Sequence, residues 1–212
     1  MLKSIITIVA VLFISGGLAV AGSQGSVYVP RAPLFAICAS IGFILHWLVF
    51  IPGFIYQTEH YFDLTGSISY IASVTVAAVL HPNLDPRGFI ICVLIFIWAT
   101  RLGSFLFIRV KKAGQDRRFT EMKTRFWRYL LTWTLGGAWV FITTAAGLAA
   151  ITSMTQRPLG IWLVIGILLW ITGFSIEVIA DWQKTRFRKD PENSENFITT
   201  GLWNYSRHPN YF

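Results

Sequence analysis

Charged residues are scarce in this sequence. Asp, Glu, Lys and Arg make up only 13% of its 212 residues, whereas an average soluble domain contains about 25%. Hydrophobic residues make up 54%, and several apolar runs reach the ~18 residues that can cross a bilayer. The composition therefore excludes an ordinary soluble domain and predicts an all-α, polytopic transmembrane helix bundle.

Metal-binding patterns are also missing. The two cysteines, Cys38 and Cys92, have neither CxxC nor Cys/His spacing, and no set of His, Asp and Glu has metal-ligand spacing. We interpret both cysteines as small buried apolar residues. His46 stands alone in an apolar run and is expected to pack or form a hydrogen bond inside the bundle. No metal centre is predicted.

Nucleotide-binding loops of the usual kinds are absent as well. The sequence contains no GxGxxG, no P-loop and no GxSxG motif. A bound nucleotide would therefore not lie on a Rossmann domain. Basic loops and the basic tail would have to hold it, with Arg and Lys on its phosphates and Trp or Tyr against its rings.

What the sequence does contain is a series of about six apolar stretches of membrane length or close to it. Ala19-Val20-Ala21 followed by Gly22 is similar to a signal-peptidase site, so residues 1–21 are either a cleaved signal peptide or a retained first helix. We assign residues 22–212 to one transmembrane domain. The stretches are residues 4–21, 34–56, 64–80, 89–110, 128–152 and 159–180.

The cations are unevenly distributed along the chain, whose formal net charge is +8. Residues 109–128 hold eight of the 18 Lys and Arg residues and only two acids. Such loops stay on the cytoplasmic side, so this loop, residues 57–67 and the tail from Asp181 are expected to share that side. The pattern fits a multi-pass protein of a bacterial inner membrane, and no nucleic-acid partner is expected.

Two groups of charged residues lie inside or beside the apolar stretches. Arg101 lies within the fourth stretch, where a cation usually faces a ligand or a partner, although its side chain could instead extend to the headgroups. Glu177, Asp181, Lys184 and Arg188 are spaced four, three and four residues apart and share one helical face. That face could bind a charged ligand at its basic end, or it could be a row of ion pairs.

Glu59 and Asp63 lie where the second apolar stretch meets the third. If this junction is helical, they form an i, i+4 pair. A partly desolvated carboxyl there could have a raised pKa and act as a proton donor. The alternative is a polar turn in which Asp63 is the N-cap of the next helix.

The final residues combine two titratable or cationic groups, an amide and several aromatic rings. These residues and three earlier segments of the chain together carry a family resemblance. They resemble the steroid 5-alpha-reductase-like membrane family, in particular its DUF1295 branch. The segments are Phe62-Asp63-Leu64-Thr65-Gly66-Ser67, Trp98-Ala99-Thr100-Arg101-Leu102-Gly103, Ala180-Asp181-Trp182-Gln183-Lys184 and Gly201-Leu202-Trp203-Asn204-Tyr205-Ser206-Arg207-His208-Pro209-Asn210-Tyr211.

The resemblance implies a helix bundle that binds NADPH on its cytoplasmic side and transfers hydride to the β-carbon of an enone in a lipid or steroid-like substrate. The acid that polarises the carbonyl would be Glu59 or Asp63. The reductases also use a Tyr, and Trp98 stands at the corresponding position. The cofactor-binding residues would be Arg101, Asp181, Lys184, Arg188, Arg207, His208, Asn210 and Tyr211.

The resemblance leaves two further expectations. In the family, the terminal motif continues into Gly-Glu and at least one more helix, so a chain that ends at Phe212 is expected to be truncated. The motif is also shared in outline with isoprenylcysteine carboxyl methyltransferases. An S-adenosylmethionine-dependent methyltransferase and a non-catalytic membrane protein are therefore the alternative functions.

Overall fold

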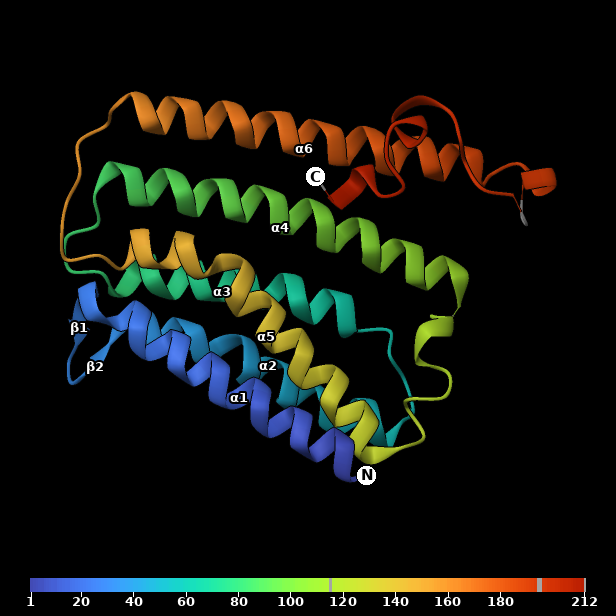
Figure 1. The fold of residues 1–212 in the computed structure, drawn as a ribbon, viewed down its shortest axis with the longest axis horizontal. Helices are drawn as coiled ribbons and strands as arrows, with labels where there is room; N and C mark the ends of the chain where they lie inside the picture. The colour runs from blue at the N-terminus through green and yellow to red at the C-terminus, as the bar shows by residue number, and fades with distance from the viewer. Residues whose placement is uncertain (115, 194–195, 212) are drawn as a thin grey trace. The chain divides into compact units, whose positions relative to one another are not determined.

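The computed structural model describes residues 1–114, 116–193 and 196–211. The chain divides into two compact units, unit 1 at Met1–Pro158 and unit 2 at Leu159–Phe212. Long helices dominate both (Figure 1). They are α1 (Leu2–Gly22), α2 (Leu34–Ile55), α3 (Phe62–Leu80), α4 (Pro86–Ala113), α5 (Phe126–Ile151) and α6 (Ile161–Phe187).

All six of these helices, within the described part of the chain, are long and apolar enough to cross a membrane. Regular β-structure in the described residues consists of one short antiparallel pair, β1 (Tyr28–Val29) and β2 (Ala32–Pro33). The expected all-α, polytopic transmembrane fold is therefore confirmed. The choice between a cleaved and a retained first helix stays a prediction.

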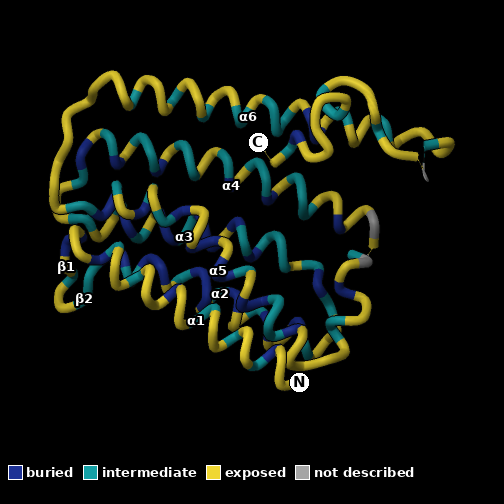
Figure 2. Tube along the Cα trace, viewed as in Figure 1, coloured by how far each residue is buried: buried dark blue, intermediate teal, exposed yellow. Residues whose placement is uncertain are grey.

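The core of unit 1 lies between α2, α3 and α5, where buried residues are concentrated (Figure 2). Helices α2 and α5 are in close contact. A Cβ atom on Gly137 would lie 2.9 Å from Cα of Phe43, and one on Gly136 would lie 2.6 Å from Cδ2 of His46. The Gly and Ala residues of α5 thus allow close helix contact, as small residues do in membrane bundles.

His46 and the two cysteines lie where the sequence predicted. His46 is only 1% exposed, and its Nδ1 donates a hydrogen bond to the carbonyl of Gly42 at 2.6 Å. The rings of Phe62 and Trp133 meet its imidazole edge to face. Both cysteines are buried free thiols, so the interpretation of these three residues as packing residues is confirmed.

Three helix boundaries differ from those expected. Helix α4 begins at Pro86 because Asp85 caps it, with Oδ1 accepting a hydrogen bond from the Gly88 amide at 2.6 Å. Its last residue is Ala113, and the C-cap that follows is Gly114, whose φ of +76° favours glycine. Because α5 already starts at Phe126, the basic loop is shorter than predicted. Helix α6 runs to Phe187, past its apolar stretch, so Glu177, Asp181 and Lys184 lie on one helix as expected.

The α1–α2 connection is fastened to the end of α5. The amide of Val27 donates to the carbonyl of Thr152 at 2.8 Å, and the amide of Met154 donates to that of Gly25 at 2.9 Å. Helices α1 and α5 therefore end together, and they begin together at the other end of unit 1 (Figure 1). That other end holds the α2–α3 junction and the α4–α5 loop.

Candidate functional site

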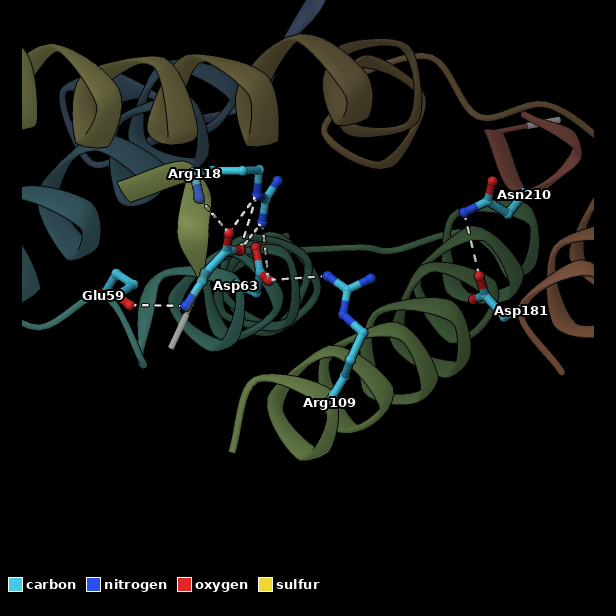
Figure 3. Close-up of polar contacts among 7 residues, drawn as sticks. Glu59, Asp63, Arg109, Arg118, Asp181 and Asn210 are labelled. Atoms are coloured by element: carbon cyan, nitrogen blue, oxygen red, sulfur yellow. Dashed lines mark hydrogen bonds and ion pairs between the residues drawn. The ribbon is translucent and has the colours of Figure 1, made fainter. Parts of the chain in front are cut away.

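The α2–α3 junction of unit 1 holds Glu59 in a non-helical turn. The residue is 3% exposed, and its carboxylate faces the α4–α5 loop. Oε2 accepts a hydrogen bond from Nζ of Lys123 at 2.7 Å, and Oε1 accepts one from the Asp116 amide at 2.9 Å (Figure 3 draws the second). Glu59 thus links the junction to the loop. The expected i, i+4 pair with Asp63 does not form, because α3 begins only at Phe62.

The surroundings of Glu59 keep it ionised. Burial by itself would raise the pKa of this carboxyl, but the hydrogen bond from Lys123, the Asp116 amide and the charge of Lys123 together hold it below its usual value. The raised pKa expected for a proton donor is therefore wrong for Glu59. The carboxyl behaves as the anionic half of a buried ion pair.

Asp63 lies in the first turn of α3 and is not its N-cap, a position that Tyr61 occupies without a side-chain hydrogen bond. Oδ2 of Asp63 lies 3.9 Å from Nη2 of Arg109 and 3.8 Å from Nη2 of Arg118 (Figure 3). Arg118 also forms a bidentate ion pair with Asp116. The N-cap alternative is thus wrong, and Asp63 belongs to a four-residue charge cluster.

Arg118 also lowers the pKa of Asp116. Partial burial would raise the pKa of Asp116, but the side-chain and backbone hydrogen bonds from Arg118 and the charges of Arg118 and Arg109 lower it. Two carboxylates from the loop and the junction, Asp116 and Glu59, are therefore anionic near neutral pH. They hold the loop against the helix ends.

Arg101 lies on α4 with its guanidinium 5.1 Å from the ring centroid of Phe105, in the geometry of a cation–π contact. Trp98, one turn earlier, packs edge to face against Tyr70 of α3 with the ring centroids 4.9 Å apart. The Tyr70 hydroxyl shares a 2.7 Å hydrogen bond with Oγ1 of Thr143. A phenol therefore lies beside the position where the resemblance expected a Tyr, a residue that the sequence reasoning missed.

Unit 2 brings together candidate residues that are far apart in the sequence. After α6 the chain turns back through η3 (Pro191–Asn193), η4 (Gly201–Asn204) and η5 (Pro209–Tyr211). Asp181 is 5% exposed, and its Oδ1 accepts a hydrogen bond from Nδ2 of Asn210 at 3.3 Å (Figure 3). The terminal motif thus folds onto the polar end of α6.

Three further contacts hold the tail against α6. The indole Nε1 of Trp203 donates to the carbonyl of Ala180 at 3.0 Å, and Lys184 places its ammonium 4.7 Å from the Trp203 ring centroid. Oε1 of Gln183 accepts a hydrogen bond from the Leu202 amide at 3.0 Å. Gly201 makes this turn possible, because its φ is +63° and a Cβ there would lie 2.4 Å from Nε2 of Gln183.

The remaining candidates of unit 2 are exposed. Arg188 follows α6, and its Nη1 donates to the carbonyl of Asn193 at 2.9 Å. Arg207 is exposed. The rings of His208 and Tyr211 are stacked with centroids 5.4 Å apart, and Tyr211 is 81% exposed. Unit 2 therefore presents cations and flat aromatic surfaces together, beside a buried carboxylate.

This donor set fits a dinucleotide. Guanidinium and ammonium groups bind phosphates, and the exposed stacked pair offers a surface to an aromatic base or a nicotinamide ring. No three His, Cys, Asp or Glu side chains of the described residues are grouped so that they could hold a metal ion.

Comparison with known proteins identifies the family of this chain. No curated protein and no solved structure matches the chain. A family model described as protein of unknown function (DUF1295) matches residues 49–212, a range that contains every candidate catalytic and cofactor-binding residue from Glu59 to Tyr211. Because the match covers more than half of the sequence, the chain belongs to the DUF1295 family.

Proposed function

We propose that this protein is a membrane-embedded, NADPH-dependent oxidoreductase that reduces a C=C bond conjugated to a carbonyl in a lipid or steroid-like substrate. The observation that carries the proposal is the return of the terminal motif onto α6, with Asn210 bonded to Asp181 and Trp203 bonded to Ala180. The resemblance to the steroid 5-alpha-reductase-like family supports the choice of reaction.

The proposal assigns cofactor binding mainly to unit 2. Lys184, Arg188 and Arg207 would bind phosphates, while His208 and Tyr211 would lie against a ring of the cofactor. Asp181 and Asn210 would position the tail. Arg101 of α4 is the remaining cofactor-binding candidate. When bound, NADPH would supply the hydride. The protein would bind and orient the cofactor and the substrate, and it would protonate the substrate.

Reduction of an enone also needs a group that stabilises the developing charge on the carbonyl oxygen. Of the two carboxyls predicted for this role, Asp63 is better suited, because its side chain is 16% exposed whereas that of Glu59 is fully enclosed. The phenol of Tyr70 is a third candidate, since it is buried beside Trp98. Glu59 would then act by positioning the loop.

The first test is cofactor binding to the full-length protein in neutral detergent, measured by titration with NADPH and with S-adenosylmethionine. We expect NADPH to bind and Arg207→Ala to weaken it about tenfold or more, because a charge-assisted hydrogen bond contributes about 1.5–3 kcal/mol. Arg31→Ala is the matched control, since it removes an exposed cation from the β1–β2 turn of unit 1.

The results separate the three functions. Binding of S-adenosylmethionine without NADPH would establish the methyltransferase alternative. Binding of neither, with Arg101→Ala and Arg207→Ala changing only thermal stability, would favour a non-catalytic membrane protein. If NADPH binds, Asp63→Asn and Tyr70→Phe should lower enone reduction while leaving the dissociation constant of NADPH unchanged.

A further inference from the structure

One end of unit 1 carries a set of exposed cations that the proposed function does not use. They lie at the start of α1, in the last turn of α4 and at the start of α5, and we call them the basic rim. Helices α1 and α5 begin at this end and α4 ends there (Figure 1). The rim consists of Lys3, Lys111, Lys112, Arg125 and Arg128.

Two other cations of the same region are paired with carboxylates and do not belong to the rim. Lys123 is paired with the buried carboxylate of Glu59, and Arg118 is paired with Asp116 and Asp63. Across the described residues, no rim cation forms such an ion pair with a carboxylate. The rim therefore keeps its charge available on the surface.

Exposed aromatic side chains next to the rim indicate that it lies at the level of the lipid headgroups. Phe126 and Trp127, between two rim residues, are 42% and 37% exposed. Phe126 packs edge to face on Phe54, with centroids 5.2 Å apart, and meets Trp127 at the same distance. Aromatic residues at the ends of membrane-spanning helices lie at the level of the lipid headgroups. The rim is thus placed where phosphates of the bilayer surface are present.

We infer that the basic rim is a binding surface for the headgroups of anionic phospholipids. A nucleic acid or an acidic protein would approach from the aqueous side, but the rim flanks the ends of helices that cross the membrane, and its neighbouring rings favour the interface. Lys and Arg near such a surface each strengthen binding to anionic lipid by about fivefold. None of the five rim residues is assigned to NADPH.

The test is equilibrium binding of fluorescent phosphatidylglycerol to the delipidated full-length protein in neutral detergent, with fluorescent phosphatidylcholine as reference. We expect the wild type to prefer phosphatidylglycerol. The pairs Lys111→Gln/Lys112→Gln and Arg125→Gln/Arg128→Gln should each weaken phosphatidylglycerol binding several-fold, with little change for phosphatidylcholine. Lys111→Arg/Lys112→Arg keeps the charge and should keep the preference.

The matched control is Arg31→Gln/Arg157→Gln, which removes two exposed cations from the opposite end of unit 1. If this pair weakens phosphatidylglycerol binding as much as the rim pairs do, net charge explains the preference and the rim is not the site. Competition by soluble glycerol phosphate as strong as that by the lipid would also overturn the inference. So would loss of NADPH binding in the rim variants, which would assign these cations to the cofactor.

Discussion

At the scale of single residues, the structure divides similar side chains into different roles. Lys123 and Lys112 both belong to the cationic region between residues 109 and 128. Lys123 forms an ion pair with Glu59, whereas Lys112 is exposed. The difference arises from one buried carboxylate at the α2–α3 junction. Burial of that carboxylate is tolerated because Lys123 and the Asp116 amide satisfy it.

Removal of Lys123 should destabilise the protein more than removal of Glu59. Lys123→Met leaves an enclosed carboxylate without its counter-charge and should lower the free energy of unfolding by about 3 kcal/mol. Glu59→Gln should lower it by only about 1 kcal/mol, because the Lys123 side chain is 19% exposed and can turn towards water. Thermal unfolding in detergent measures both. Equal losses would contradict an enclosed carboxylate.

The same pair predicts a pH dependence. The pKa of Glu59 is lower in the folded state than the ordinary value of a glutamate carboxyl, so its ionisation stabilises the fold above that ordinary value. The contribution is lost as the pH falls through the folded pKa. We expect wild type to lose more stability than Glu59→Gln when the pH is lowered from about 7 to about 3, measured by melting temperature. Parallel curves would argue against this linkage.

At the scale of elements, small residues determine which helices can approach each other. Helices α2 and α5 pack closely at Gly136 and Gly137, while Gly16 and Gly17 of α1 face open space. In the tail the corresponding feature is Gly201 of η4, which lets the tail reach Gln183 of α6. Glycine at these positions thus determines helix packing and tail docking.

Gly137→Ala should destabilise unit 1. The added methyl group would lie 2.9 Å from the Phe43 backbone, and overpacking of this kind costs about 1–3 kcal/mol. Gly16→Ala is the control, because nothing lies within 4 Å of a Cβ there and alanine is the better helix former by about 1 kcal/mol. Chemical unfolding in mixed micelles measures both. A neutral Gly137→Ala would show that α2 and α5 can separate easily.

Gly201→Ala should release the tail from α6. Its positive φ and the 2.4 Å approach to Gln183 are both unfavourable to a side chain, at about 1–3 kcal/mol. We expect faster trypsin cleavage after Arg188 and Lys189, and weaker NADPH binding if the proposed function is correct. Gly166→Ala on α6 has no atom within 4 Å of its Cβ and should leave the cleavage rate unchanged.

At the scale of the whole molecule, the membrane-spanning helices and the charge distribution predict one orientation. Residues 109–128 carry eight cations and two acids, and a loop of this kind stays in the cytoplasm. The β1–β2 turn, at the opposite end of the unit 1 helices, should then face the other side. The tail from Asp181 is also basic, so the same rule predicts that it lies in the cytoplasm.

Cysteine labelling tests this orientation. Lys112→Cys should react with a membrane-impermeant maleimide only from the cytoplasmic side, and Arg31→Cys only from the opposite side. The native thiols should give little background, because Cys38 and Cys92 are buried. Labelling of both variants from one side would contradict the assigned topology.

The sequence by itself determined the fold class, the approximate position of each span and the burial of His46, because hydropathy and small-residue content are properties of local composition. It also predicted a terminal motif that acts together with Asp181. Only the tertiary structure decided the ion pair of Glu59, the ion-pair partners of Asp63 and the neighbour of Trp98. Those depend on partners such as Lys123, Arg118 and Tyr70, which lie many residues away and meet only through packing.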